Sequence, residues 1–283
     1  MSAAAGTRRD SHVGGVIRPP AGWELPDLRE LWDYRDLVLF LVRRDLAVRY
    51  RQTLLGVAWA VVQPVGFALV LSLFLGFVLD APSAGVPRPA FVLTGLTLWL
   101  FFTQAVSRAS DSTVGSASLI SKVYFPRMVM PLSAVVAPAV DFLVAFAVLI
   151  LVLLGYGVPL DWHVVLVPAA FLLTLALAVG AGLWLSALVV AYRDIRLAIP
   201  FLIQLGLFAT PVIYPLSAIP DRFEALYSLN PMVGATELFR WALLPGAETP
   251  GSLVLVPVLA ALLLLVTGAL VFTRAQRTFA DVI

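Results

Sequence analysis

The chain has 283 residues, of which 61% are hydrophobic and 13% are charged, whereas an average soluble domain carries about 25% charged residues. A single soluble core could not bury so much apolar surface, so the composition indicates an all-α integral membrane protein whose helices satisfy their own backbone polar groups. The net charge of +2 is too small to indicate a nucleic-acid partner, and the absence of cysteine excludes disulfides, thiol nucleophiles and thiolate metal sites.

The N-terminal segment, residues 1–27, is mostly small and polar. Arg8 and Arg9 are not followed by an apolar stretch, so the segment is not typical of a secretory signal peptide. We expect a disordered tail on the cytosolic side of a membrane.

Residues 28–55 combine helical periodicity with many charges. Apolar residues such as Leu28 and Leu46 alternate with charged residues such as Arg29 and Asp45. A segment this charged cannot span a bilayer, and the pattern predicts an amphipathic interface helix lying on the cytosolic face. The pair Leu55-Gly56 ends the pattern and leads into the membrane.

Six apolar segments follow within residues 56–283. Each is close to the ~20 residues that a helix needs to cross a hydrocarbon core of ~30 Å. The pattern therefore predicts six transmembrane helices. They cover about residues 57–79, 90–106, 132–155, 164–190, 197–214 and 253–272.

The basic residues orient these spans. With the N-terminus inside, all but three of the 19 Lys and Arg residues fall on the inner side. Inner loops of membrane proteins carry an excess of Lys and Arg, so both termini are predicted to be cytosolic. The exceptions are Arg88, Arg222 and Arg240.

Between the fifth and sixth spans, residues 215–250 are neither a plain loop nor a full crossing. Prolines interrupt the stretch, and the apolar piece between Pro231 and Pro245 is too short to span. Such backbone is tolerated at membrane depth where protein or a water-lined cavity surrounds it. We therefore expect re-entrant helices here.

The only lysine, Lys122, lies in the loop between the second and third spans. No glycine-rich loop precedes it, so the phosphate-binding motif G-x-x-x-x-G-K-S/T is absent and ATP cannot be bound in that way. The polar loop of residues 108–127 could form a short helix that faces a cytosolic domain, or it could be an ordinary positive-inside loop. His12 and His163 are too far apart in the sequence to suggest a metal site.

Two further features leave alternatives open. A carboxylate inside a span costs roughly 2.5–3.5 kcal/mol at its centre, so Asp141 faces either a neighbouring helix, as a structural hydrogen-bond partner, or a water-filled path. Arg49 and Arg51, beside the membrane entrance, could bind an anionic head group bidentately or serve as a positive-inside anchor. Aromatic side chains in the spans could stack on sugars or form an interface belt.

Several short stretches resemble one family. They begin with Arg49-Tyr50-Arg51, Leu54-Leu55-Gly56-Val57-Ala58-Trp59 and Gln63-Pro64. They continue with Leu93-Thr94-Gly95-Leu96, Trp99, Phe102, Lys122-Val123-Tyr124-Phe125-Pro126-Arg127 and Tyr192-Arg193-Asp194. They end with Thr210-Pro211-Val212-Ile213-Tyr214-Pro215 and Leu229-Asn230-Pro231-Met232. In this order they resemble the membrane subunit of type-2 ABC exporters of polysaccharides, which includes the O-antigen, teichoic-acid and capsule permeases.

The resemblance implies a permease of the bacterial cytoplasmic (inner) membrane that exports a polyprenyl-pyrophosphate-linked polysaccharide, for example in lipopolysaccharide biosynthesis. It implies a homodimer with two copies of a cytosolic ABC ATPase subunit, which would bind ATP and Mg²⁺. The permease itself would be neither an enzyme nor a cofactor-binding protein.

The resemblance also implies roles for particular residues. A coupling helix at about residues 115–124 would contact the ATPase, and the turn after the interface helix would lie near the lipid pyrophosphate. Aromatic rings would line the glycan path. The coupling residues are Ser118, Ser121, Lys122, Tyr124 and Arg127; the lipid-pyrophosphate residues are Arg49, Arg51, Leu55 and Gly56; the path residues are Trp59, Phe67, Trp99, Phe102 and Tyr214.

Two other functions compete with this one. A drug or lipid exporter of the same superfamily would show a smooth hydrophobic cavity. A membrane-embedded polyprenyl-phosphate or glycosyl transferase would need clustered carboxylates for Mg²⁺, and the spans and inner loops carry no paired carboxylates.

Overall fold

The computed structural model describes residues 26–50, 56–77, 85–120, 122–277 and 279. Within these ranges the chain forms helices and connecting turns and contains no strand, which confirms the predicted all-α class. Residues 1–25 of the predicted tail (residues 1–27) lie outside the described residues, as do Arg51, Leu55 and Ser121.

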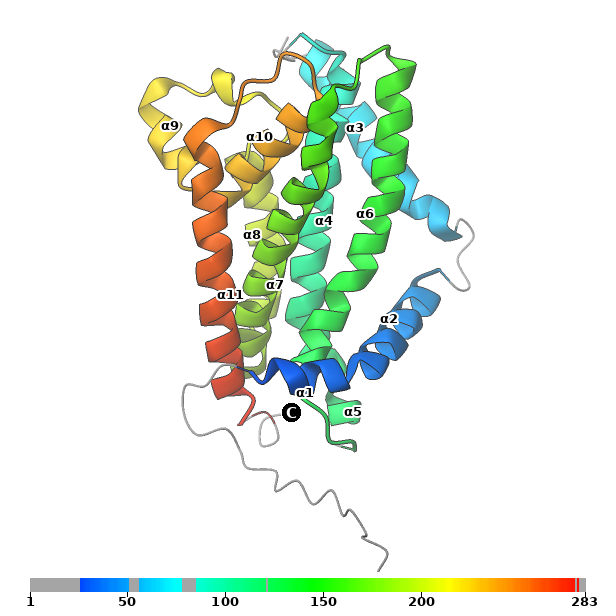
Figure 1. Cartoon of the computed structure of the whole chain (residues 1–283), viewed down its shortest axis with the longest axis vertical. Coiled ribbons are helices and arrows are strands. Elements are labelled where there is room, and N and C mark those ends of the chain that lie inside the picture. The colour runs from blue at the N-terminus through cyan, green and yellow to red at the C-terminus, as the bar shows by residue number, and fades with distance from the viewer. Residues whose placement is uncertain (1–25, 51–55, 78–84, 121, 278, 280–283) are drawn as a thin grey trace, which may run out of the picture.

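Among the described residues, four helices are long and apolar enough to cross a membrane, and they stand side by side as a bundle (Figure 1). They are α4 (Arg88–Gly115), α6 (Val129–Gly155), α7 (Val167–Ala191) and α11 (Leu255–Ala275). Short 3₁₀ turns, η2 (Trp162–Leu166) and η4 (Gly251–Val254), lead into α7 and α11. Helix α4 packs against both α6 and α7, and α7 packs against α11.

The α7–α11 contact depends on glycine. A Cβ atom on Gly180 would lie 2.7 Å from the backbone carbon of Leu264, and a Cβ atom on Gly268 would lie 2.7 Å from the carbonyl oxygen of Gly180. Real Cβ atoms do not approach so closely. Small residues therefore let the two helix backbones meet, as is common where helices pack in membranes.

Two shorter apolar helices correspond to the first and fifth predicted spans. Helix α3 (Trp59–Phe77) crosses α4 and α6 obliquely. Helix α8 (Ile195–Ala209) contacts α4 and α7 and lies partly behind α7 in Figure 1. Each contains a proline, Pro64 in α3 and Pro200 in α8, which removes one backbone hydrogen bond. Both helices expose large apolar side chains along one side.

At one end of the bundle lie α1 (Leu28–Asp33) and α2 (Arg35–Tyr50), in the segment predicted as the interface helix (Figure 1). Asp27 begins α1 by accepting a hydrogen bond from the backbone nitrogen of Arg29 at 2.8 Å. We call this end the α1/α2 end. The short helix α5 (Ala117–Ile120) and the loop after it lie at the same end.

The opposite end carries η3 (Leu216–Ala218), α9 (Asp221–Ser228) and α10 (Pro231–Leu243) (Figure 1). Helix α9 is largely exposed, whereas α10 is buried against α4, α7 and α11. A Cβ atom on Gly234 would lie 2.2 Å from the carbonyl oxygen of Leu253, so α10 sits directly against η4, the turn that leads into α11.

Candidate coupling, head-group and transport sites

The α5 loop and the α1/α2 pair share one hydrophobic cluster. Leu41 of α2 and Phe125 of the loop are almost fully buried in it, together with Val129 and Met130 at the start of α6. Leu119 and Ile120 of α5 pack against the same cluster, as does Leu31 of α1. We call this the α2–α5 cluster. Close-packed side chains therefore join α5 to α2.

The predicted coupling residues divide into two sets. Lys122 and Tyr124 are exposed at the α1/α2 end, as is Ser118. Partial desolvation of its hydroxyl, followed by the nearby Glu30 and Tyr34, raises the pKa of the Tyr124 phenol. Exposed polar side chains here are accessible to a partner protein.

Arg127, by contrast, is turned toward the bundle. Its guanidinium donates to the backbone oxygen of Gln276, just after α11, and lies 5.9 Å from the ring centroid of Phe279. The side chain therefore ties the loop before α6 to the end of α11, and its contacts are internal.

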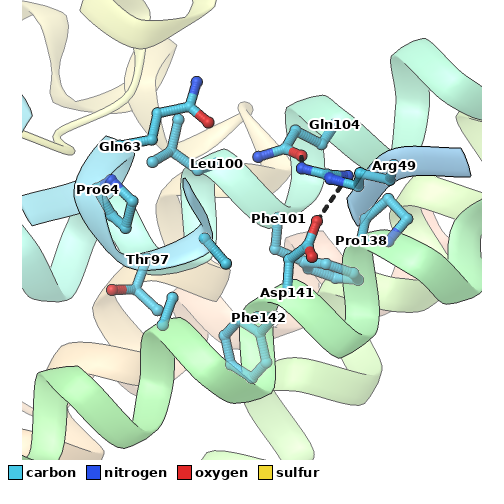
Figure 2. Close-up of a pocket in the computed structure, with 12 residues that line it drawn as sticks. Arg49, Gln63, Pro64, Thr97, Leu100, Phe101, Gln104, Pro138, Asp141 and Phe142 are labelled. Carbon is cyan, nitrogen blue, oxygen red and sulfur yellow. Dashed lines mark hydrogen bonds and ion pairs between the residues drawn. The ribbon is translucent and has the colours of Figure 1, made fainter. Parts of the chain in front are cut away.

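Arg49 and Asp141 form an ion pair with a nitrogen–oxygen distance of 2.6 Å (Figure 2). Arg49 also donates to the side-chain oxygen of Gln104 at 2.7 Å, and the Tyr50 hydroxyl donates to the other carboxylate oxygen of Asp141. Asp141 is only 6% exposed. The sequence left open a structural partner or a water-filled path for Asp141, and the structure provides the partner: the end of α2 is joined to the interior of α6.

Two cavities lie on either side of Arg49. The inner cavity, drawn in Figure 2, lies between α3, α4 and α6 and has a volume of about 20 Å³. That is room for about one water molecule. Its lining includes Gln63 and Pro64 of α3, Thr97 and Phe101 of α4, and Asp141 of α6.

The outer cavity, which we call the rim pocket, opens at the α1/α2 end and has a volume of about 560 Å³. It is formed by α2, α4 with the residue that follows it, and α6. Arg49 lines both cavities, so its ion pair with Asp141 separates them. The rim pocket is lined by Arg44, Asp45, Val48, Arg49, Ser107, Arg108, Asp111, Ser112, Gly115, Ser116, Met130, Ser133 and Ala134.

At the other end of the bundle, the buried Arg240 of α10 holds the turn after α8. Its guanidinium donates to the backbone oxygen of Val212 at 2.7 Å and of Tyr214 at 3.3 Å. It also pairs with Glu237 at 2.8 Å and lies 4.0 Å from the ring centroid of Phe91. Sequence reasoning counted Arg240 only as an outer basic residue. A cation inside a short apolar segment was the signal that could have identified it.

Three of the family-like stretches meet around this arginine. Gly95 of α4 lies under the turn, where a Cβ atom would come within 2.3 Å of the Val212 oxygen. Asn230 caps α10 by accepting from the Met232 nitrogen at 3.0 Å, and donates to the Thr210 hydroxyl oxygen at 2.9 Å. The chain thus fixes the turn between Thr210 and Pro215 from three sides.

The predicted path aromatics lie in different places. Trp99 is 5% exposed and packs against Gly206 of α8, with Phe102 beside it at a centroid distance of 5.9 Å. Trp59 and Phe67 are both 51% exposed on α3. The Tyr214 hydroxyl donates to the Phe208 oxygen at 2.5 Å, so this ring supports the turn. Within one chain the structure does not gather these five rings around a common cavity.

Comparisons with known proteins identify the family. Residues 36–244 match the model of the ABC-2 type transporter. The chain is 33% identical over 261 residues to the O-antigen export system permease protein RfbA of Myxococcus xanthus, covering 90% of this chain and 98% of the relative. It is 27% identical over 252 residues to the RfbA permease of Klebsiella pneumoniae, covering 88% and 95% of the two chains.

A more distant relative carries a different glycan in its name. The polysialic acid transport protein KpsM of Escherichia coli is 27% identical over 218 residues, covering 75% of this chain and 82% of the relative. The segment matched by the family model includes all of α2 except its first residue, together with the α5 loop, the Arg49–Asp141 pair and the turn held by Arg240. The chain therefore belongs to the ABC-2 type transporter family of membrane proteins.

Proposed function

We propose that this chain is the permease subunit of an ATP-driven exporter that moves a polyprenyl-pyrophosphate-linked polysaccharide, such as an O-antigen or a similar glycan, across the bacterial cytoplasmic membrane. It acts as a homodimer with two copies of a cytosolic ABC ATPase, which bind ATP and Mg²⁺. The names of its relatives support the class of substrate, because they are export permeases for O-antigen and polysialic acid.

In this proposal α3 and α8 are the first and fifth of six spans. The α9–α10 segment is re-entrant at the outer side, and both chain termini are cytosolic. The distribution of Lys and Arg supports this orientation, since the α1/α2 end carries most of them. The small inner cavity supports a dimer, because a path for a polymer must then be formed between two chains and not inside one.

The α2–α5 cluster is the observation that carries the mechanism. ATP binding closes the ATPase subunits, and this movement reaches the permease at Ser118, Lys122 and Tyr124. The cluster passes the displacement to α2, and the Arg49–Asp141 pair passes it from α2 to α6. The two permeases then separate along their shared axis and the glycan moves outward.

Reconstitution tests the proposal directly. The permease, its ATPase and a lipid-linked glycan are placed in proteoliposomes, and delivery of the glycan to the opposite side is measured with an impermeant lectin. Delivery should require both proteins and ATP, and should stop when the ATPase carries an inactivating change of its phosphate-binding lysine. Delivery by the permease alone, or formation of a new glycosylated product without ATP, would refute an ATP-driven permease.

A further inference from the structure

We infer that the rim pocket binds the phosphate groups of an anionic lipid, and that Arg108 is their principal ligand. The inference rests on the proposed function for the identity of the lipid, a polyprenyl pyrophosphate. The family resemblance implies Arg49, Arg51 and the Leu55-Gly56 turn as residues near the lipid pyrophosphate. Arg49 lines the rim pocket as well, and Arg108 lies in the same pocket.

The size of the pocket and the hydroxyls that line it suit a head group. Its volume of about 560 Å³ falls within the range of roughly 300–1,000 Å³ that is usual for small-ligand sites. The Ser112 and Ser133 hydroxyls donate to carbonyl oxygens of their own helices, at 2.7 and 3.0 Å. Within the described residues, Ser107 and Ser116 donate no side-chain hydrogen bond, so both remain available to phosphate oxygens.

The charges in the pocket are unequally compensated. Asp45 is paired with Arg44 at 2.9 Å, and Asp111 is paired with Arg196 of α8 at 2.9 Å. Arg49 is paired with Asp141. Arg108 is partly buried in the same pocket and forms no ion pair with any residue that the structure describes. The pocket therefore presents one guanidinium that is outside any ion pair, repelled by Arg49 and attracted by Asp45 across the pocket. Its geometry matches phosphate oxygens bidentately.

The surroundings favour a lipid over a free phosphate ion. Val48, which lines the pocket, is 74% exposed. Val136 is 38% exposed on α6, about one turn beyond Ser133. An amphiphile can place its phosphates beside Arg108 and its chain along this apolar side of α6. A soluble anion would gain no binding energy from the exposed apolar side chains of Val48 and Val136.

Arg49 adds a response to binding. It lies at the inner wall of the rim pocket, within the same cavity as Arg108, and its present partner is Asp141. A phosphate held by Arg108 would compete with Asp141 for Arg49. Binding of the lipid would then loosen the joint between α2 and α6 that separates the two cavities.

The test uses the full-length permease in nanodiscs and three probes: polyprenyl pyrophosphate, inorganic pyrophosphate and the matching polyprenyl alcohol. The variants are R108Q, R108K and the control R43Q, which removes the same charge from an exposed α2 residue outside the pocket. R108Q should weaken binding of polyprenyl pyrophosphate by about 10- to 100-fold, as expected for a lost charge-assisted hydrogen bond. R108K should lie between R108Q and the wild type, and R43Q should change binding less than about twofold.

The probes separate the possible outcomes. Binding of the alcohol should be equal in all variants, because it has no phosphate. Equal affinity of R108Q and R43Q for polyprenyl pyrophosphate would overturn the assignment of Arg108. If inorganic pyrophosphate binds in an Arg108-dependent manner but polyprenyl pyrophosphate does not bind, the lipid assignment would be overturned. Failure of the proposed function would appear elsewhere, as wild-type complex that delivers no glycan with ATP.

Discussion

Arg49 at the end of α2 and Asp141 in the middle of α6 are far apart in the sequence, yet their side chains meet at 2.6 Å. Either charge would be costly to bury without the other, and the pairing offsets that cost. The pair also lies where the inner cavity meets the rim pocket. It is thus both a stabilising contact and the partition between two spaces.

Breaking this pair from one side should be more damaging than exchanging it. D141N or R49Q leaves one charge buried and unpaired, which typically costs about 3–5 kcal/mol. We expect both single variants to lower thermal stability in detergent and to reduce export in cells. The exchanged variant R49D/D141R should recover part of both. If R49D/D141R is no better than the single variants, direct pairing is not what matters at these positions.

Gly95 should tolerate no side chain. A Cβ atom would lie 2.3 Å from the Val212 oxygen and 3.1 Å from the Arg240 guanidinium. G95A is therefore expected to displace the turn after α8 and to destabilise the protein by about 1–3 kcal/mol, as overpacking does. G66A is the matched control, since a Cβ on Gly66 of α3 meets nothing within 4 Å. Melting curves of both variants, compared with the wild type, provide the measurement.

Arg240 should depend on the shape of its side chain as well as on its charge. R240K keeps the charge, but an ammonium group cannot reproduce the fixed fork that reaches both Val212 and Tyr214. Each lost charged hydrogen bond is worth about 1.5–3 kcal/mol. We expect R240K to lower the melting temperature and R240Q to lower it further. R222Q, on the exposed α9, serves as the control. A wild-type melting temperature for R240K would contradict this role.

The coupling surface predicts a contrast between two basic residues of one loop. Lys122 is exposed, so K122E should leave stability unchanged while reducing export at least about tenfold, the effect of losing roughly 1.4 kcal/mol at a partner contact. Arg127 is bound to the end of α11, so R127Q should lower the melting temperature of the isolated permease. Both are measured with and without the ATPase. Normal export by K122E would remove Lys122 from the coupling surface.

The long helices could be predicted because length and apolarity alone determine a span, and the family could be predicted from a few short stretches. The C-terminal end of α4 was harder to predict from the sequence. The prediction stopped at Val106, but α4 continues to Gly115. Ser110 and Ser112 bond back to carbonyl oxygens of their own helix, and Thr113 meets Ser186 of α7 at 2.7 Å. The back-bonds satisfy the serine hydroxyls within the helix, and the Thr113–Ser186 contact holds this polar segment against α7. A hydropathy pattern does not show such contacts.

The C-terminal end of α8, by contrast, could have been predicted from the sequence. The fifth span was predicted to reach Tyr214, whereas the helix ends at Ala209 and Thr210 is extended. Thr210 precedes Pro211, and a residue before proline is disfavoured in the helical region. Pairings between distant residues were a different matter. Nothing in the spacing of Arg49 and Asp141, or of Arg240 and Val212, shows that they meet, because such contacts exist only once the helices have packed.

The close packing of α7 against α11 at their glycines determines which helices can move during opening. Where two backbones touch at Gly180 and Gly268, neither helix can slide without a steric clash. Helices α7 and α11 will therefore move together as a rigid body. We expect the opening movement to fall on α3 and α8, which are less closely packed against the other helices than α7 and α11 are and which expose large apolar side chains. A crosslink between α7 and α11 would leave transport intact, whereas one that staples α8 to α4 would arrest it.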